Sequence, residues 1–312
     1  MALPRWLGTR LRLPMIGAPM FLGSGPALVA AQCRAGIIGA FPSLNARPRE
    51  HLADWLAELD AGTDAAAAPF AVNLVVHRRN DRLEHDLQVC VDARVPIVIT
   101  SLGARPEVND AVHGYGGLVL HDVTDDRFAR KAIEKGADGL IAVAAGAGGH
   151  AGALSPFALV GEIRRWFDGP LALAGAIATG EGVLAAEAIG ADLAHVGSPF
   201  IATPEARADP AYRAMIVAGT AADIVNTDRF SGIAANYLEA SVRAAGFDPA
   251  ALPVTRRELD LRADGDGPRA WRDIWSAGQG IGAVDAVEPA GARIAAFAAA
   301  YDRARRRLCG SG

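Results

Sequence analysis

The sequence predicts a TIM-like (β/α)₈ barrel, an α/β fold, with a small helical insertion after the eighth strand. Short apolar runs alternate eight times with longer, alanine-rich segments of amphipathic character over roughly two hundred residues. The runs are continuously apolar, which is typical of parallel strands covered on both faces. No GxGxxG motif opens the first βα turn, and this disfavours the competing fold, a doubly wound open sheet.

The predicted strands are rich in aliphatic residues, and two of them end at glycine, at Gly17 and Gly103. They are expected at Pro14–Gly17, 37–40, Pro69–Val76, 96–103, 117–123, 139–145, 170–176 and 193–200. Helices are expected between them at 25–36, 48–62, 82–95, 105–116, 124–138, 155–169 and 179–192. Pro48 stands near the start of one helix, Thr124 and Ser155 are predicted N-caps, and Pro156 suits a first helical position.

The pattern changes after the eighth strand. Residues 204–267 contain helical pieces at 209–219 and 234–246, followed by a stretch rich in Pro, Asp and Gly. We expect a small helical lid here, over the mouth of the barrel. The chain then returns and closes with a helix from Ala290 to about Arg307. The predicted division is therefore a barrel domain, 1–203 with 268–312, and a lid, 204–267.

Composition excludes several classes of protein. Hydrophobic residues make up 51% of the 312 residues, so a large core is expected and disorder is not. The net charge of -4 and the lack of a basic face argue against nucleic acid, and no apolar segment is long enough to span a membrane. Three widely spaced cysteines make neither a disulfide framework nor a metal cluster, so we expect no metal and a reducing, cytoplasmic compartment.

Sites in such barrels lie at the carboxyl ends of the strands. Small residues, Gly175–Ala176 and Gly197–Ser198, follow strands seven and eight. In this fold the corresponding loops often bind a phosphate through backbone N–H groups. Glycine is also common at βα turns that bind nothing, so this pattern alone leaves both interpretations open.

A histidine stands in a glycine-rich segment directly after strand six. Glycine allows a backbone to approach a ligand closely, and imidazole exchanges protons near neutral pH. A lone buried histidine is more often structural, but the position of His150 beside Gly148, Gly149 and Gly152 favours catalysis. The histidines at 51, 77, 85 and 113 are expected on helices or at the surface.

Together these segments resemble the nitronate monooxygenase family, formerly called 2-nitropropane dioxygenases. The resemblance covers nearly the whole chain. Its motifs are PMIGAPM (14–20), AVNL (71–74), AGAGGHAG (145–152), LAGAIATGEGVLAAEAIGADLAHVGSPFIATPEA (173–206) and AGQGIG (277–282). The combination of the Gly-Gly-His-x-Gly loop with the segments after strands seven and eight is specific, whereas each piece alone is weak.

The resemblance implies one non-covalently bound FMN, with His150 as the catalytic histidine. The implied cofactor contacts lie in the matching motifs: Pro19 and Met20 by the flavin ring, Asn73 hydrogen-bonded to it, Gly148 and Gly149 beside it, Ala174, Gly175, Ala176, Gly197 and Ser198 around the phosphate, and Gln279 and Gly280 in a closing loop. One departure concerns charge. Some members place a lysine after strand five, where this chain has His121 and Asp122.

The activity that the resemblance implies is oxidation of an alkyl nitronate, or of a nitroalkane, by O₂ to a carbonyl compound and nitrite. His150 would act as a neutral base or, protonated, as an anion-binding group, and the sequence leaves both open. An apolar lining of Met20, Phe21 and Phe200 would suit a small alkyl group. The sequence also leaves a homodimer open.

Three alternatives share this barrel. A flavin-dependent enoyl-thioester reductase would use the same Gly-His-x-Gly loop, together with a nicotinamide donor. A purine-nucleotide dehydrogenase is disfavoured because it needs a cysteine on a loop, whereas Cys33 and Cys90 fall on predicted helices and Cys309 in the tail. A non-catalytic flavin-binding protein is the third.

Overall fold

A computed structural model describes residues 3–64, 66–252 and 267–310 of the chain. At its centre is a closed barrel of parallel strands, in the order β1-β2-β3-β4-β5-β6-β8-β9. These strands are β1 (Met15–Gly17), β2 (Ile38–Pro42), β3 (Phe70–Val75), β4 (Ile97–Ser101), β5 (Leu118–Val123), β6 (Gly139–Val143), β8 (Leu171–Ala174) and β9 (Leu193–Val196). The barrel closes where β9 pairs with β1, with His195 opposite Ile16. The predicted (β/α)₈ barrel is confirmed.

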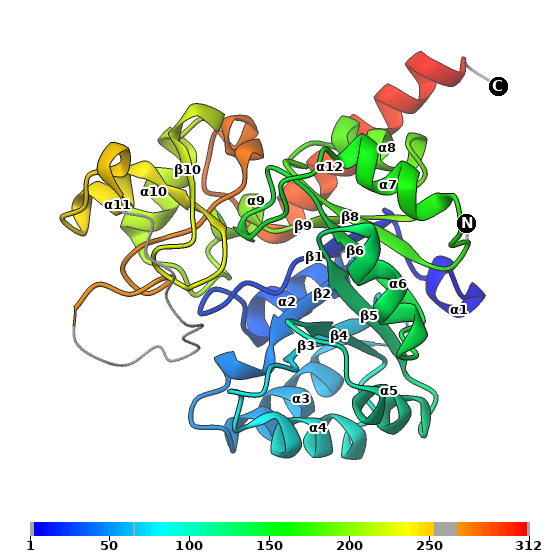
Figure 1. The fold of residues 1–312 in the computed structure, drawn as a ribbon. Helices are drawn as coiled ribbons and strands as arrows, with labels where there is room; N and C mark the ends of the chain where they lie inside the picture. Colours follow the sequence, from blue (N-terminus) through cyan, green and yellow to red (C-terminus); the bar gives the residue numbers. More distant parts are fainter. Residues whose placement is uncertain (1–2, 65, 253–266, 311–312) are drawn as a thin grey trace.

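Helices surround the barrel (Figure 1). They are α1 (Arg5–Gly8), α2 (Pro26–Arg34), α3 (His51–Gly62), α4 (Leu83–Asp92), α5 (Pro106–His113), α6 (Asp126–Glu134), α7 (Pro156–Arg164), α8 (Gly180–Ala188), α9 (Ser198–Ile201) and α12 (Ala290–Cys309). Ser155 is the N-cap residue of α7, as predicted. The prediction for Thr124 is wrong, because Asp125 caps α6 and its carboxylate accepts a hydrogen bond from the Phe128 N–H at 2.8 Å.

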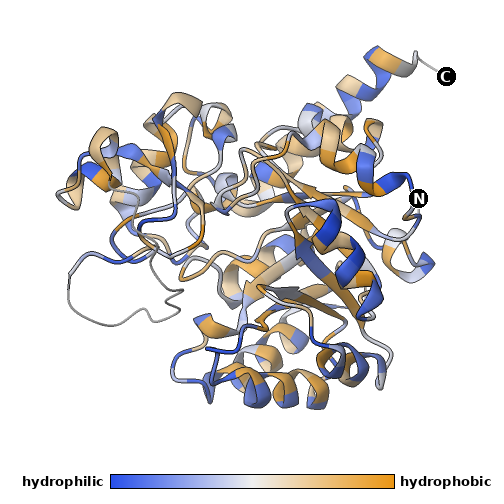
Figure 2. Cartoon of the chain, in the orientation of Figure 1, coloured by the Kyte–Doolittle hydropathy of each residue, from blue (hydrophilic) through white to orange (hydrophobic). Residues whose placement is uncertain are grey.

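Two apolar layers explain why the strands are continuously apolar. On β4, the side chains of Ile97 and Ile99 belong to the cluster inside the barrel, while Val98 belongs to the cluster between the barrel and the helices. Successive strand residues point to opposite faces, so both sets are buried here. Figure 2 shows the polar residues gathered on the outer faces of the helices at the bottom of the view.

The closing helix α12 packs against α8 at an unusually short distance. A Cβ atom at Gly180 would lie 2.1 Å from the carbonyl oxygen of Phe297. Only glycine allows the two backbones to approach this closely. The helix runs two residues beyond the predicted Arg307, and Cys309 is its last residue rather than part of a tail.

The segment after β9 forms a second, smaller unit that lies to one side of the barrel in Figure 1. It contains α10 (Pro210–Ala218), β10 (Ile224–Thr227), β11 (Ala235–Leu238) and α11 (Glu239–Ala244), with short 3₁₀ helices η2 (Ala221–Asp223) and η3 (Pro249–Ala251). Two further 3₁₀ helices are η1 (Ser43–Asn45) and η4 (Gln279–Ala283). The prediction of a helix over 234–246 is wrong in its first half, because residues 235–238 pair with β10 as a strand.

The lid is joined to the barrel by a strand from the glycine-rich loop. Strand β7 (Gly149–His150) pairs with β11 in a three-stranded sheet of order β10-β11-β7, so His150 belongs to the edge of that sheet. The predicted boundaries, 1–203 with 268–312 and 204–267, remain a prediction, and residues 253–266 lie outside the described residues. None of the described helices has the length and apolar character needed to cross a bilayer.

Candidate active site

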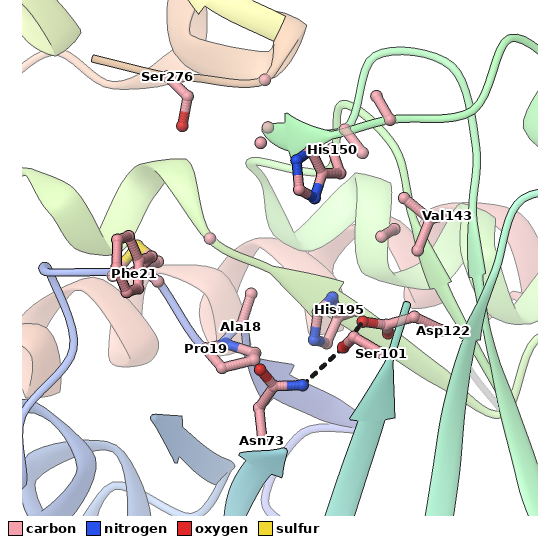
Figure 3. A pocket seen from close by; sticks show the side chains of 18 of the residues that line it. Ala18, Pro19, Phe21, Asn73, Ser101, Asp122, Val143, His150, His195 and Ser276 are labelled. Carbon is pink, nitrogen blue, oxygen red and sulfur yellow. Dashed lines mark hydrogen bonds between the residues drawn. The ribbon is translucent and has the colours of Figure 1, made fainter. Parts of the chain in front are cut away.

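A cavity of about 620 Å³ opens at the carboxyl ends of the barrel strands, beneath the three-stranded sheet. Its floor comes from the strand ends of the barrel, and its roof from the glycine-rich loop, Ile233 and the segment 271–280. Figure 3 shows His150 above the cavity and Asn73, Ser101, Asp122 and His195 below it.

The floor carries a hydrogen-bonded row on three neighbouring strands. Asn73 on β3 donates from Nδ2 to Ser101 Oγ on β4 at 2.6 Å, and Ser101 Oγ donates to Asp122 Oδ2 on β5 at 2.6 Å (Figure 3). These three residues follow apolar inward-facing residues on their strands, so they form the uppermost layer inside the barrel. Asn73, predicted from its isolation in an apolar run, is therefore part of a polar network.

Two floor atoms have no hydrogen-bond partner in the described part of the chain. They are Asp122 Oδ1 and His195 Nε2, and both are buried. Burial raises the pKa of Asp122 to about 6, against the opposing effect of the Ser101 hydrogen bond. Burial lowers the pKa of His195 to about 4, so this ring is neutral at pH 7. Buried polar atoms are usually paired, and these two therefore indicate a polar ligand.

Sequence reasoning missed His195. The signal was available, because Leu193 and His195 are two residues apart on a strand and so share its inward face. Two side chains at the end of β5, His121 and Asp122, occupy the region where the resemblance implies a lysine in some family members. His121 lies 2.5 Å from Thr100 Oγ1 through Nδ1, whereas Asp122 joins the row on the floor.

His150 is fixed above the cavity by the small sheet. The backbone of His150 pairs with that of Ala235 on β11. Asn236 Nδ2 on the same strand donates to the Ala147 carbonyl at 2.7 Å and so holds the part of the glycine-rich loop that precedes His150. His150 Nε2 lies 3.2 Å from Ser231 Oγ. The Ser231 hydroxyl donates to the Ile233 carbonyl at 2.9 Å and accepts from the Tyr237 hydroxyl at 3.3 Å, and this arrangement favours donation from His150 Nε2–H to Ser231 Oγ.

The network favours one tautomer of the imidazole. In that tautomer the proton lies on Nε2 and Nδ1 of His150 carries the lone pair. Burial lowers the pKa of His150 to about 4. The ring of the free protein is therefore neutral at pH 7.

The loop after β9 is hydrogen-bonded to the segment that begins η4, and the loop after β8 is hydrogen-bonded to the glycine-rich loop. Gly278 N–H donates to Ser198 Oγ at 2.8 Å, and Ala176 N–H donates to the Gly146 carbonyl at 3.2 Å. The Ala176 N–H thus has a partner within the protein, whereas Ser198 Oγ accepts and its hydroxyl hydrogen can still be donated. A phosphate near these loops could accept from the Ser198 hydroxyl and from other backbone N–H groups there.

Most of the predicted site residues line this cavity. They are Pro19, Met20, Asn73, Gly148, Gly149, His150, Ala174, Gly175, Ala176, Gly197, Ser198 and Gly280. Gln279 stands outside the lining, and its N–H donates to the Gly146 carbonyl at 2.9 Å. Of the apolar side chains expected to face substrate, Met20 and Phe21 line the cavity, but Phe200 does not, because it is wholly buried in the outer core. Sequence reasoning also missed Trp271 in the roof.

Residues 79–295, more than half of the chain, match the family model described as nitronate monooxygenase. The chain belongs to the nitronate monooxygenase family. It is therefore a flavin-dependent oxidoreductase. A nitronate monooxygenase of Paraburkholderia phytofirmans is 28% identical over 78% of this chain and 80% of its own length.

Solved structures agree with the fold of this family member. FabK from Thermotoga maritima is 26% identical and superimposes with a TM-score of 0.80, covering 97% of this chain and 96% of its own. A nitroalkane oxidase from Streptomyces ansochromogenes has a TM-score of 0.81 at 24% identity, covering 97% of this chain and all of its own, and it supports the fold alone.

The residues of the cavity fit a flavin. Its volume lies within the range of small-molecule and cofactor sites, and most of its lining is apolar with a few polar groups. The unpaired Asp122 Oδ1 and His195 Nε2 offer hydrogen bonds to a ring edge that carries both N–H and C=O groups. Among the described residues no group of three His, Cys, Asp or Glu side chains could hold a metal ion.

Proposed function

We propose that this protein binds FMN and catalyses the oxidation of alkyl nitronates by O₂ to a carbonyl compound and nitrite. The observation that carries the proposal is the neutral His150, fixed above a largely apolar cavity and opposite a polar floor, in a chain of this family. The substrates are a small nitronate, or the parent nitroalkane, and O₂.

Two parts of the cavity would hold the cofactor. Backbone N–H groups after β8 and β9, around Gly175 and Gly197, would bind the phosphate. The ring would then extend over the floor, where Asn73, Asp122 and His195 could contact its polar edge. When bound, the flavin supplies the redox chemistry, and the protein supplies orientation and electrostatics.

His150 would act on the proton of the substrate. With hydrogen on Nε2, its Nδ1 can accept the α-proton of a neutral nitroalkane. An imidazole with a pKa near 4 is a weak base, so this step should be slow. A nitronate has already lost that proton, and it is therefore the substrate that this arrangement favours.

The apolar walls would exclude water and hold the alkyl group. Met20 and Phe21 from the loop after β1 face the cavity. A dry site strengthens the hydrogen bonds that the polar groups make to an anionic substrate. The apolar walls also limit the size of the alkyl group that can enter.

The test is anaerobic mixing of the flavin-loaded protein with a small alkyl nitronate. We expect loss of the oxidised-flavin absorbance, followed by its return when oxygen is admitted. Denaturation should release FMN and not FAD. An unchanged spectrum with nitronate, together with reduction by NAD(P)H and reoxidation by an enoyl thioester, would support the enoyl-thioester reductase. An unchanged spectrum with all of these would support a flavin-binding protein without turnover.

A further inference from the structure

The roof of the cavity contains a tryptophan in a tightly constrained turn. The backbone of Trp271 has a positive φ of 64°, and its N–H donates to the Ile274 carbonyl at 2.8 Å. Arg269 N–H also donates to the Asp273 carboxylate, at 2.9 Å. Because a bulky residue rarely adopts positive φ, the surrounding turn must hold Trp271 in place.

The indole ring connects the barrel to the lid. Its centroid lies 5.1 Å from that of the His150 ring and 5.8 Å from that of Phe21, with edge-to-face angles of 86° and 83°. Phe21 comes from the loop after β1, and His150 comes from β7 in the small sheet. Arg47 covers Phe21, 5.4 Å from its centroid. Phe21, Trp271 and His150 therefore form a continuous row of rings at the cavity, which we call the aromatic roof.

We propose that Trp271 determines substrate specificity by closing the cavity above the alkyl group and thereby limiting its length. This inference rests on the proposed function. The head group would lie beside His150, whose ring is 5.1 Å from the indole ring of Trp271, so an alkyl group that lengthens along the roof meets Trp271. Trp271 is the largest side chain in that roof, and it is also in contact with His150 itself.

The expected size of the effect follows from burial of methylene groups. Each methylene that enters an apolar pocket strengthens binding by about fourfold. In the wild type this gain should stop at the chain length that reaches the indole ring. In Trp271→Ala the gain should continue for several further carbons, because an aromatic side chain occupies a large apolar volume.

The test uses linear carboxylates of increasing length, because a carboxylate is a planar anion with the same charge as a nitronate. Calorimetry of the flavin-loaded protein measures Kd without requiring turnover. For Trp271→Ala we expect the longest acids to bind at least tenfold more tightly than to the wild type, while acetate binds within about threefold of it. The matched control is Trp166→Ala, since Trp166 packs against Phe167 and Arg130, and none of these three residues lines the cavity. It should keep the wild-type profile.

Identical chain-length profiles for the wild type and Trp271→Ala would overturn the inference. If Trp271→Ala does not fold, Trp271→Phe carries the test: it retains a ring beside His150 but is shorter, so the profile should extend by fewer carbons, and an unchanged profile again overturns the inference. The two proposals can also fail separately. If the chain-length profile of carboxylate binding differs between the wild type and Trp271→Ala as expected, but the wild type oxidises no nitronate, the proposed function is contradicted and the role of Trp271 is supported.

Discussion

Replacing Gly278 by alanine should push the segment that begins η4 away from the glycine-rich loop, and these two segments form one side of the cavity. A Cβ atom at this position would lie 2.7 Å from the Gly146 carbonyl oxygen and 2.9 Å from the Gly148 nitrogen. Both are backbone atoms, so neither can rotate away. The backbone angle of Gly278 is ordinary, with φ of -86°, and the effect is therefore steric alone.

The contacts set the expected magnitude. Inserting a methyl group into a well-packed site typically costs about 1–3 kcal/mol. If the displaced loops must return to their original position to bind the cofactor, flavin affinity falls by about 5- to 150-fold. If the cost falls on folding instead, the melting temperature drops by about 2–4 °C for each kcal/mol.

The assay titrates the apoprotein with FMN and records the melting temperature of the same samples. Gly282→Ala is the matched control, since a Cβ atom there would meet only the Thr220 Cα, at 3.7 Å. It should bind FMN as the wild type does. The reasoning is refuted if Gly278→Ala matches the wild type in both flavin Kd and melting temperature, because the loops would then not be packed as described.

Three further predictions concern charge, catalysis and the core. Burial raises the pKa of Asp122 to about 6. As the pH rises from about 4 to 6, the free energy of unfolding of the wild type, measured in urea, should therefore fall by about 2–3 kcal/mol relative to that of Asp122→Asn. A difference that does not depend on pH would contradict this. His150→Ala should retain FMN but lose roughly 10²- to 10⁴-fold in kcat/KM for nitroalkanes, with a smaller loss for nitronates, and equal losses would argue against a base. Asp192→Ala should lower the free energy of unfolding by about 3–5 kcal/mol without changing the FMN Kd, because it breaks the 2.6 Å pair with the partly buried Arg164; a stability within 1 kcal/mol of wild type would show that the pair is dispensable.

The barrel could be predicted from the sequence because each of its strands and helices is marked by residues within or directly beside it. Each strand is a short apolar run, and helices carry their own signals, such as Pro156 at the start of α7. The lid was harder to predict. Residues 235–238 read as part of a helix, but pairing with β10 and with the distant His150 makes them a strand, and such pairing cannot be read from a single window.

The residues of the candidate site likewise fall into those marked by their neighbours in the sequence and those placed by contacts with distant segments. His150 could be predicted because glycines surround it, and Asn73 because it interrupts an apolar run. His195 could have been found from the two-residue period of its strand. Trp271 could not, since its position depends on the turn from Arg269 to Ile274 and on the meeting of two loops. The burial of Phe200 likewise depends on the direction of a short helix.

The most direct test of the central claim is to supply a small alkyl nitronate and air to the purified, flavin-loaded protein while oxygen and nitrite are measured together. We predict rapid oxygen consumption with nitrite release in proportion, and kcat/KM that stays constant from pH 7 to 9, because this range lies above the pKa of His150, about 4, and that of Asp122, about 6. Flavin-loaded protein that consumes no oxygen and releases no nitrite under these conditions would contradict the account.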